Sequence, residues 1–111
     1  MKHEIYKCLF DVREAISDIE SFISDKEYDD YEQSRLLQAA VERKFEVIGE
    51  ALNRVKILDS EFIENITDYR RIIGFRNVIA HGYDIVEGTM VWLVIKNHLP
   101  KLNEEVTKFL N

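Results

Sequence analysis

The residues best suited to chemistry lie in one short stretch, 76–83, which holds a guanidinium, an amide, an imidazole and a phenol. They belong to Arg76, Asn77, His81 and Tyr83. Arginine's planar, permanently charged fork matches a phosphate, and histidine exchanges protons near neutral pH. Such a pair can promote attack of an RNA 2′-hydroxyl on its neighbouring phosphodiester without a metal ion. Acid–base help of this kind is worth about 10² to 10⁴ in rate.

Two other reaction types are poorly supported. The three histidines, His3, His81 and His98, lie far apart in sequence and lack the spacing typical of a metal site. No serine or cysteine sits in a recognisable nucleophile elbow. The single cysteine, Cys8, excludes an intrachain disulfide and the usual cysteine metal motifs. The sequence therefore predicts no metal ion and no cofactor.

Arg76 occupies an unusual place in its helical pattern. On an ideal helix, the segment 72–81 puts this residue in the middle of an apolar arc. The arc consists of Ile72, Ile73, Phe75, Ile79 and Ala80. A guanidinium there is costly to bury unless an anion or a hydrogen-bond partner accompanies it. Glu46, Glu50 and Asn53 form a polar face on the preceding helix, and they are either such partners or simply a solvated face.

The other side of the same helix is an open strip of low bulk. Asn77 and His81 are four residues apart and lie one above the other, with Gly74 beside them. Gly82 can end the helix, because glycine readily takes the left-handed conformation just past a helix terminus. Arg76 and His81 point about 140° apart, so one helix does not easily aim both at one phosphate. The reach of arginine, a helix end before His81 or pairing across a dimer would solve this, and we favour the dimer.

Apolar spacing predicts helices almost throughout the chain. Steps of three and four residues recur in three long seams, as in amphipathic helices. The seams are Ile5, Leu9, Val12, Ile16, Ile19 and Ile23; Leu37, Val41, Lys44, Ile48, Ala51 and Val55; and Trp92, Ile95, Leu99, Leu102, Val106 and Phe109. A short linking helix is expected over 57–66, capped by Asp59 or Ser60. We predict an all-α antiparallel bundle of four to five helices in one domain, 1–111, and the seams exceed what one small core needs, which also favours a homodimer.

Four positions within this pattern carry specific expectations. Asp30 is the expected N-cap of the second long helix. Lys44 interrupts that helix's apolar stripe and is expected to lay its stem along apolar surface. Gly49 should cost about 1 kcal/mol relative to alanine, so we expect a close helix crossing there. Pro100 predicts a kink or break near 97–99, because proline removes a backbone hydrogen bond and clashes with the preceding turn.

Charge and composition restrict the partners. The 111-residue chain has a formal net charge of -6 and a pI near 5.1. Because phosphate affinity rests on cations, this acidity argues against a general nucleic-acid coat, and any RNA contact must be local. Arg70 and Arg71, which cluster with Arg76, are the RNA-binding candidates, although three solvated arginines are an equally good interpretation. Charged residues interrupt every apolar run and no basic-plus-apolar leader opens the chain, so we expect a cytoplasmic protein with no membrane contact.

The motif also carries a family resemblance. Arg76, four residues, His81, one residue and Tyr83 form a pattern that resembles the signature of HepT-like toxins, a branch of the HEPN superfamily of small helical ribonucleases. The segments 42–52 and 91–100 resemble the second long helix and the last helix of that family. The resemblance runs in order over nearly the whole chain. It implies a helical fold, a metal-independent endoribonuclease, and a homodimer in which two motif copies face one cleft.

The resemblance assigns roles to individual residues. It implies that Arg76 and His81 are the catalytic groups and that Asn77 supports them. It also implies that Tyr83 is the site where a partner antitoxin, a minimal nucleotidyltransferase, attaches AMP. A bulky anion beside His81 would fill the cleft and repel RNA phosphate. The main alternative is a non-catalytic helical dimer that binds nucleotide or a nucleotidyltransferase, and a purely structural bundle is the third possibility.

Overall fold

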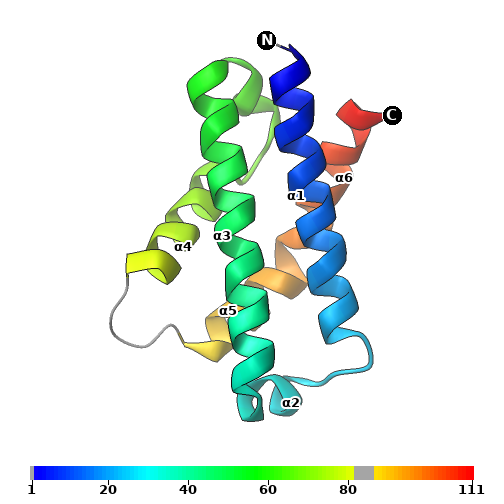
Figure 1. The fold of residues 1–111 in the computed structure, drawn as a ribbon, viewed down its shortest axis with the longest axis vertical. Coiled ribbons are helices and arrows are strands. Elements are labelled where there is room, and N and C mark those ends of the chain that lie inside the picture. Colours follow the sequence, from blue (N-terminus) through cyan, green and yellow to red (C-terminus); the bar gives the residue numbers. More distant parts are fainter. Residues whose placement is uncertain (1, 82–86) are drawn as a thin grey trace.

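The computed structural model describes residues 2–81 and 87–111, apart from the side chains of Lys2 and His81. In chain order its elements are α1 (Lys2–Ile23), α2 (Tyr28–Gln33), α3 (Arg35–Leu58), the 3-10 helix η1 (Phe62–Asn65), α4 (Tyr69–His81), α5 (Gly88–Asn97) and α6 (Leu99–Leu110). These residues form six α-helices and no strand, so the predicted all-α fold is confirmed (Figure 1). The number exceeds the predicted four to five, because α2 was not expected and the last seam is divided between α5 and α6.

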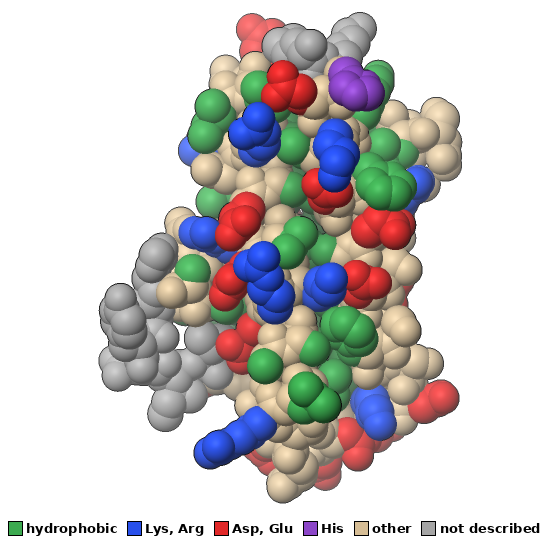
Figure 2. Space-filling model, viewed as in Figure 1, with side chains coloured by type: hydrophobic (Ala, Val, Ile, Leu, Met, Phe, Trp, Pro, Cys, Tyr) green, Lys and Arg blue, Asp and Glu red, His purple; other side chains and the backbone are tan. Residues whose placement is uncertain are grey.

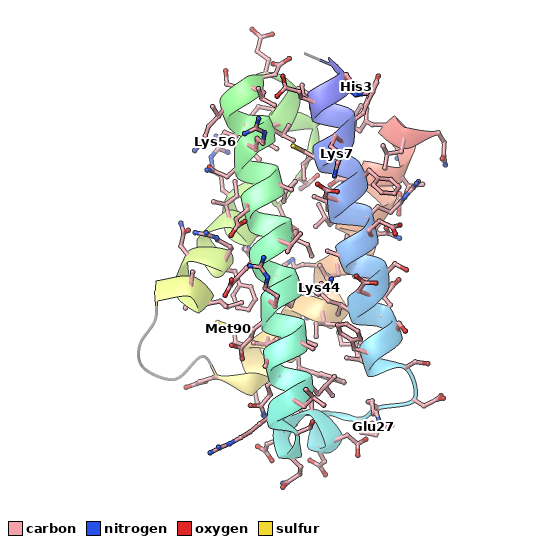
Figure 3. All side chains as sticks on the ribbon, viewed as in Figure 1. His3, Lys7, Glu27, Lys44, Lys56 and Met90 are labelled. Carbon is pink, nitrogen blue, oxygen red and sulfur yellow. The ribbon has the colours of Figure 1, made fainter. Side chains whose placement is uncertain are left out.

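The two long helices, α1 and α3, lie side by side and run in opposite directions (Figure 1). Helix α6 packs against α1, α4 packs against α3, and α5 contacts α2 and α6. Lys44 of α3 lies between the long helices (Figure 3), and its Nζ is 2.9 Å from Oδ2 of Asp18 on α1. This lysine therefore does more than cover apolar surface, since its ion pair also links the two helices.

The core is built from the faces that the three seams predicted. All six seam residues of α1 are buried, as are Val41, Ile48, Ala51 and Val55 of α3. In the third seam Ile95, Leu99, Leu102 and Val106 are buried, and Trp92 and Phe109 are partly buried against them. One chain thus uses the seams for its own core. Our expectation that they exceed its needs was wrong, and they provide no argument for a dimer.

The acidic connection after α1 forms a short helix, α2, which the apolar spacing did not predict. Asp30 does not cap the second long helix; it lies in the first turn of α2, where its Oδ2 accepts the backbone N–H of Glu27 at 2.8 Å. Ser34 is the N-cap of α3, and its Oγ accepts the backbone N–H three residues later at 3.0 Å. Tyr31 of α2 is fully buried, with its ring 5.6 Å from that of Trp92. Burial of this ring stabilises the extra turn, which hydrophobic spacing alone did not indicate.

The break predicted near Pro100 is confirmed, whereas the linking helix predicted over 57–66 is only partly present. Asp59 follows α3, and its Oδ1 accepts the backbone N–H of Phe62 at 3.0 Å, where η1 begins. The link is therefore a single 3-10 turn rather than a helix over the whole of 57–66. Near Pro100 the chain breaks as expected, since α5 ends at Asn97 and α6 begins at Leu99. Proline is tolerated there because the first turn of a helix does not need its N–H.

The surface carries charges of both signs, which are interspersed over the face seen in Figure 2. Large apolar side chains are exposed at Tyr6, Phe10, Leu36, Ile57, Val78, Met90 and Leu93. No helix in the described ranges is both long and apolar enough to cross a lipid bilayer. The face in Figure 2 has no continuous basic track, so any cationic site on it has to be local.

Candidate active site at the crossing of α3 and α4

Helix α4 carries the predicted motif and is anchored at its start and in its middle. At Tyr69, the first residue, the hydroxyl donates to Oε2 of Glu64 at 2.6 Å, and this hydrogen bond raises the pKa of the phenol. Phe75 is buried, and its ring packs edge-to-face on Phe45 of α3 with centroids 5.1 Å apart. Because Arg76 follows Phe75 directly, this aromatic contact fixes where the arginine stem meets α3.

Gly49 is buried in α3 against the stem of Arg76. A Cβ atom on Gly49 would lie 2.5 Å from Cγ of Arg76 and still closer to its Cβ. Such a contact is sterically forbidden, so glycine is needed for the backbone of α3 to approach the arginine this closely. The predicted close helix crossing is confirmed. Contact between α3 and the methylene stem of Arg76 compensates for the helix propensity that Gly49 loses relative to alanine.

The guanidinium of Arg76 is held by acceptors from two helices. Its Nη2 donates to Oε1 of Glu50 on α3 at 3.1 Å, and its Nη1 donates to Oδ1 of Asn77 at 3.0 Å. The Arg76 side chain is 24% exposed, whereas that of Glu50 is 50% exposed. Of the two interpretations of this polar face, partners for Arg76 or a solvated surface, the first holds for Glu50. It is wrong for Glu46, which pairs instead with Arg43 at 3.2 Å.

A small cavity of about 170 Å³ opens beside this cluster. It is lined by Gly49, Glu50, Asn53, Ile73, Arg76 and Asn77. The Nε of Arg76 is buried and has no hydrogen-bond partner among the described residues. A larger hollow of about 500 Å³ lies where α1, α2 and α3 meet, around Phe22 and Leu36, and contains none of the motif residues. We place the candidate site at the smaller cavity, because its lining carries the Arg76 guanidinium, which can bind a phosphate, together with the Glu50 carboxylate and Asn77 amide that hold it.

The open strip predicted on the other side of α4 is found at Gly74, whereas the Asn77 side chain turns toward Arg76 and lines the same cavity. Asn77 and Gly74 are exposed, and a Cβ on Gly74 would meet nothing within 4 Å. His81 is the last residue of α4, but its side chain lies outside the described residues. Tyr83 also lies outside them. The roles of His81 and Tyr83 therefore stay predictions. Of the four motif residues, the structure shows Arg76 and Asn77 in direct contact.

The two candidate RNA-binding arginines both have partners on the protein surface. Arg70 is exposed and pairs with Glu64 at 3.2 Å. Arg71 is also exposed, and its Nη1 lies 3.4 Å from Nε2 of His98, whose Nδ1 lies 3.1 Å from Oδ2 of Asp68. No local sequence pattern indicates this network, because 30 residues separate Asp68 from His98. Arg70 and Arg71 remain candidates for phosphate contact, since both side chains reach solvent.

The fold and the site together define a class of protein: a small helical bundle whose polar centre is a partly buried arginine at a helix crossing. Comparison with known families identifies the class more closely. The ribonuclease HepT-like family matches residues 12–109. The chain belongs to this family of HepT-like ribonucleases, which confirms the resemblance inferred from the motif.

Individual relatives agree with this placement. A Methanocaldococcus jannaschii protein named "Putative RNase MJ1380" is 27% identical over 95% of both chains. Another protein of that organism, "Gamma-glutamylcyclotransferase and putative RNase MJ0434", is 35% identical over 99% of this chain, which spans 49% of the relative. "Probable ribonuclease HepT" of Thermococcus cleftensis is 29% identical over 97% of both chains. No solved structure gives a significant match.

Proposed function

We propose that this chain, as one domain over residues 1–111, is a metal-independent endoribonuclease that acts as the toxin of a toxin–antitoxin pair. Membership of the HepT-like ribonuclease family and the names of the relatives support an RNA substrate. The observation that carries the proposal is the guanidinium of Arg76, which Glu50 and Asn77 hold beside a small cavity. A guanidinium fixed at such a cavity supplies the paired, charged donors that a phosphodiester binds.

In the proposed reaction, His81 accepts the proton of an RNA 2′-hydroxyl while that oxygen attacks the adjacent phosphorus. The bond from phosphorus to the 5′ oxygen breaks, and this leaving oxygen takes up a proton from water, while protonated His81 returns its proton to the solvent. The products are a 2′,3′-cyclic phosphate and a free 5′-hydroxyl. Arg76, supported by Asn77, stabilises the negative charge that builds up on the phosphate oxygens. Arg70 and Arg71 bind phosphates that flank the cleaved bond.

An assay of the purified protein on RNA in the presence of EDTA tests this function. We expect cleaved RNA whose new 3′ ends carry cyclic phosphates and resist enzymes that need a free 3′-hydroxyl. Intact RNA together with tight nucleotide binding would instead favour a non-catalytic dimer that binds nucleotide or a nucleotidyltransferase. Intact RNA without nucleotide binding would favour a purely structural bundle.

We place the active site between two copies of the chain, with Arg76 from one copy and His81 from the other. The support is geometric: these positions point about 140° apart on an ideal helix, and Glu50 draws Arg76 toward α3 of its own chain. We expect a mixture of Arg76→Ala and His81→Ala proteins to regain about a quarter of wild-type cleavage, because half of the dimers are mixed and one of their two sites is intact. A site within one chain would regain nothing.

The mass in solution measures the same assembly independently. Val78 on α4, which carries the motif, and Met90 and Leu93 on α5, the next helix, are more than half exposed and supply apolar surface there. Light scattering at micromolar concentration should therefore give the mass of a dimer. A monomer under these conditions would contradict the shared site.

Tyr83 is the proposed point of control. The antitoxin, a separate minimal nucleotidyltransferase, transfers AMP from ATP to the phenol oxygen and releases pyrophosphate. We expect Tyr83→Phe to stay toxic and to escape the antitoxin, because phenylalanine lacks the oxygen that accepts AMP. Tyr6→Phe is the control, since Tyr6 is exposed on α1 and its loss should leave neutralisation intact. Mass spectrometry locates the adduct, and AMP on another tyrosine would contradict the assignment.

A further inference from the structure

The ion pair between Glu50 and Arg76 has no role in the proposed reaction as described so far. The carboxylate of Glu50, from α3, meets Nη2 of Arg76 at 3.1 Å, while Asn77 holds Nη1 at 3.0 Å. Both terminal nitrogens of the fork are therefore engaged from different helices. Arginine has a long stem with many rotamers, and fixing its fork before the substrate arrives removes that ordering cost from binding and from the reaction.

The same contact has an opposing effect, because a carboxylate beside the guanidinium repels a phosphate. Two observations favour the positioning effect. Half of the Glu50 side chain is exposed, so water screens its charge. The stem of Arg76 lies against Gly49 and is largely buried, so the stem cannot swing freely and the direction of the fork depends on its polar contacts.

We propose that Glu50 is a positioning residue, which aims the guanidinium of Arg76 at the cavity where the phosphodiester binds. This inference rests on the proposed ribonuclease function. Gly49 lets the arginine stem lie against α3, and Glu50, the next residue, holds the fork at the end of that stem. Two consecutive residues of α3 therefore position the Arg76 side chain: Gly49 contacts its stem and Glu50 binds its guanidinium. Glu50 acts through Arg76, whose Nη2 it holds at 3.1 Å.

Cleavage kinetics of three single variants test the role. Glu50→Ala should lower kcat/KM about tenfold, mainly through kcat, because the fork loses its orientation. Glu50→Gln keeps an acceptor oxygen and should retain most of the activity. Glu46→Ala is the matched control, since Glu46 lies one turn earlier on α3, pairs with Arg43 and should leave cleavage unchanged. A rise in cleavage by Glu50→Ala would overturn the proposal, because it would identify Glu50 as a competitor of phosphate.

A double variant shows whether Glu50 acts through Arg76. In an Arg76→Ala background, Glu50→Ala should cause no further loss of the residual activity, because its target is already absent. An additional tenfold loss would assign Glu50 a separate role and overturn the proposal. Thermal unfolding of each variant checks that the differences do not come from loss of the fold.

A spectroscopic measurement separates this inference from the proposed function. Nitrogen NMR of the Arg76 guanidinium reports how freely the fork rotates, whether or not RNA is cleaved. We expect slow rotation in the wild type and in Glu46→Ala, and faster rotation in Glu50→Ala. Intact RNA with this pattern would defeat the ribonuclease proposal and leave the positioning contact standing. Unchanged rotation in Glu50→Ala would overturn the positioning role even if RNA is cleaved.

Discussion

Alanine at Arg76 or at His81 is expected to lower RNA cleavage by about 10² to 10⁴-fold and to abolish growth inhibition by the expressed protein. Arg76→Ala removes the charge that Glu50 and Asn77 hold at the cavity, so the developing phosphate charge is left without its main stabilising group. His81→Ala removes the proton acceptor for the 2′-hydroxyl. Single-turnover measurement of cyclic-phosphate formation quantifies both losses.

Matched controls separate chemistry from folding. Arg54 is a second arginine that pairs across helices at 3.1 Å, with Glu4, and His3 is exposed on α1. Arg54→Ala and His3→Ala should keep wild-type cleavage, because neither residue lines the cavity. All four variants should retain wild-type helicity by circular dichroism. Toxicity that survives Arg76→Ala or His81→Ala would contradict the catalytic roles.

Gly49→Ala is expected to destabilise the protein, although alanine is the better helix former. Alanine gains about 1 kcal/mol in helix propensity, but its Cβ would lie 2.5 Å from Cγ of Arg76. The atoms it meets are the base of the arginine stem, which cannot move without shifting α4, and such overpacking costs about 1 to 3 kcal/mol. The net free energy of unfolding should fall, by up to about 2 kcal/mol. Cleavage should fall with it, because Arg76 is displaced.

Gly74→Ala is the matched control for this steric argument. Gly74 is also helical, but a Cβ there meets nothing within 4 Å. The propensity gain is then unopposed, and the free energy of unfolding should rise by about 0.5 to 1 kcal/mol. Urea unfolding of both variants measures the difference. A gain in stability for Gly49→Ala would contradict the close crossing, and a loss for Gly74→Ala would indicate that a second chain approaches the open strip.

Local patterns predicted much of the fold. Apolar steps of three and four residues identified the buried faces of α1 and α3 and of α5 with α6, because side-chain direction along a helix follows from spacing alone. Pro100 located the break between the last two helices, since its effect on the backbone is also local. The short helix α2 was missed, because it depends on Tyr31 packing against Trp92, a residue distant in sequence.

By itself, the sequence determined the all-helical class, the inward-facing seams and the residue types available for chemistry, because periodicity and side-chain type belong to each segment alone. The family motif also named His81 and Tyr83, whose side chains lie outside the described residues, so their roles stay predictions. Only the tertiary structure decided that Glu50, rather than Glu46, meets Arg76. Glu50 and Arg76 are 26 positions apart, and their contact depends on where α3 and α4 cross. Gly49 permits this close crossing because it has no side chain.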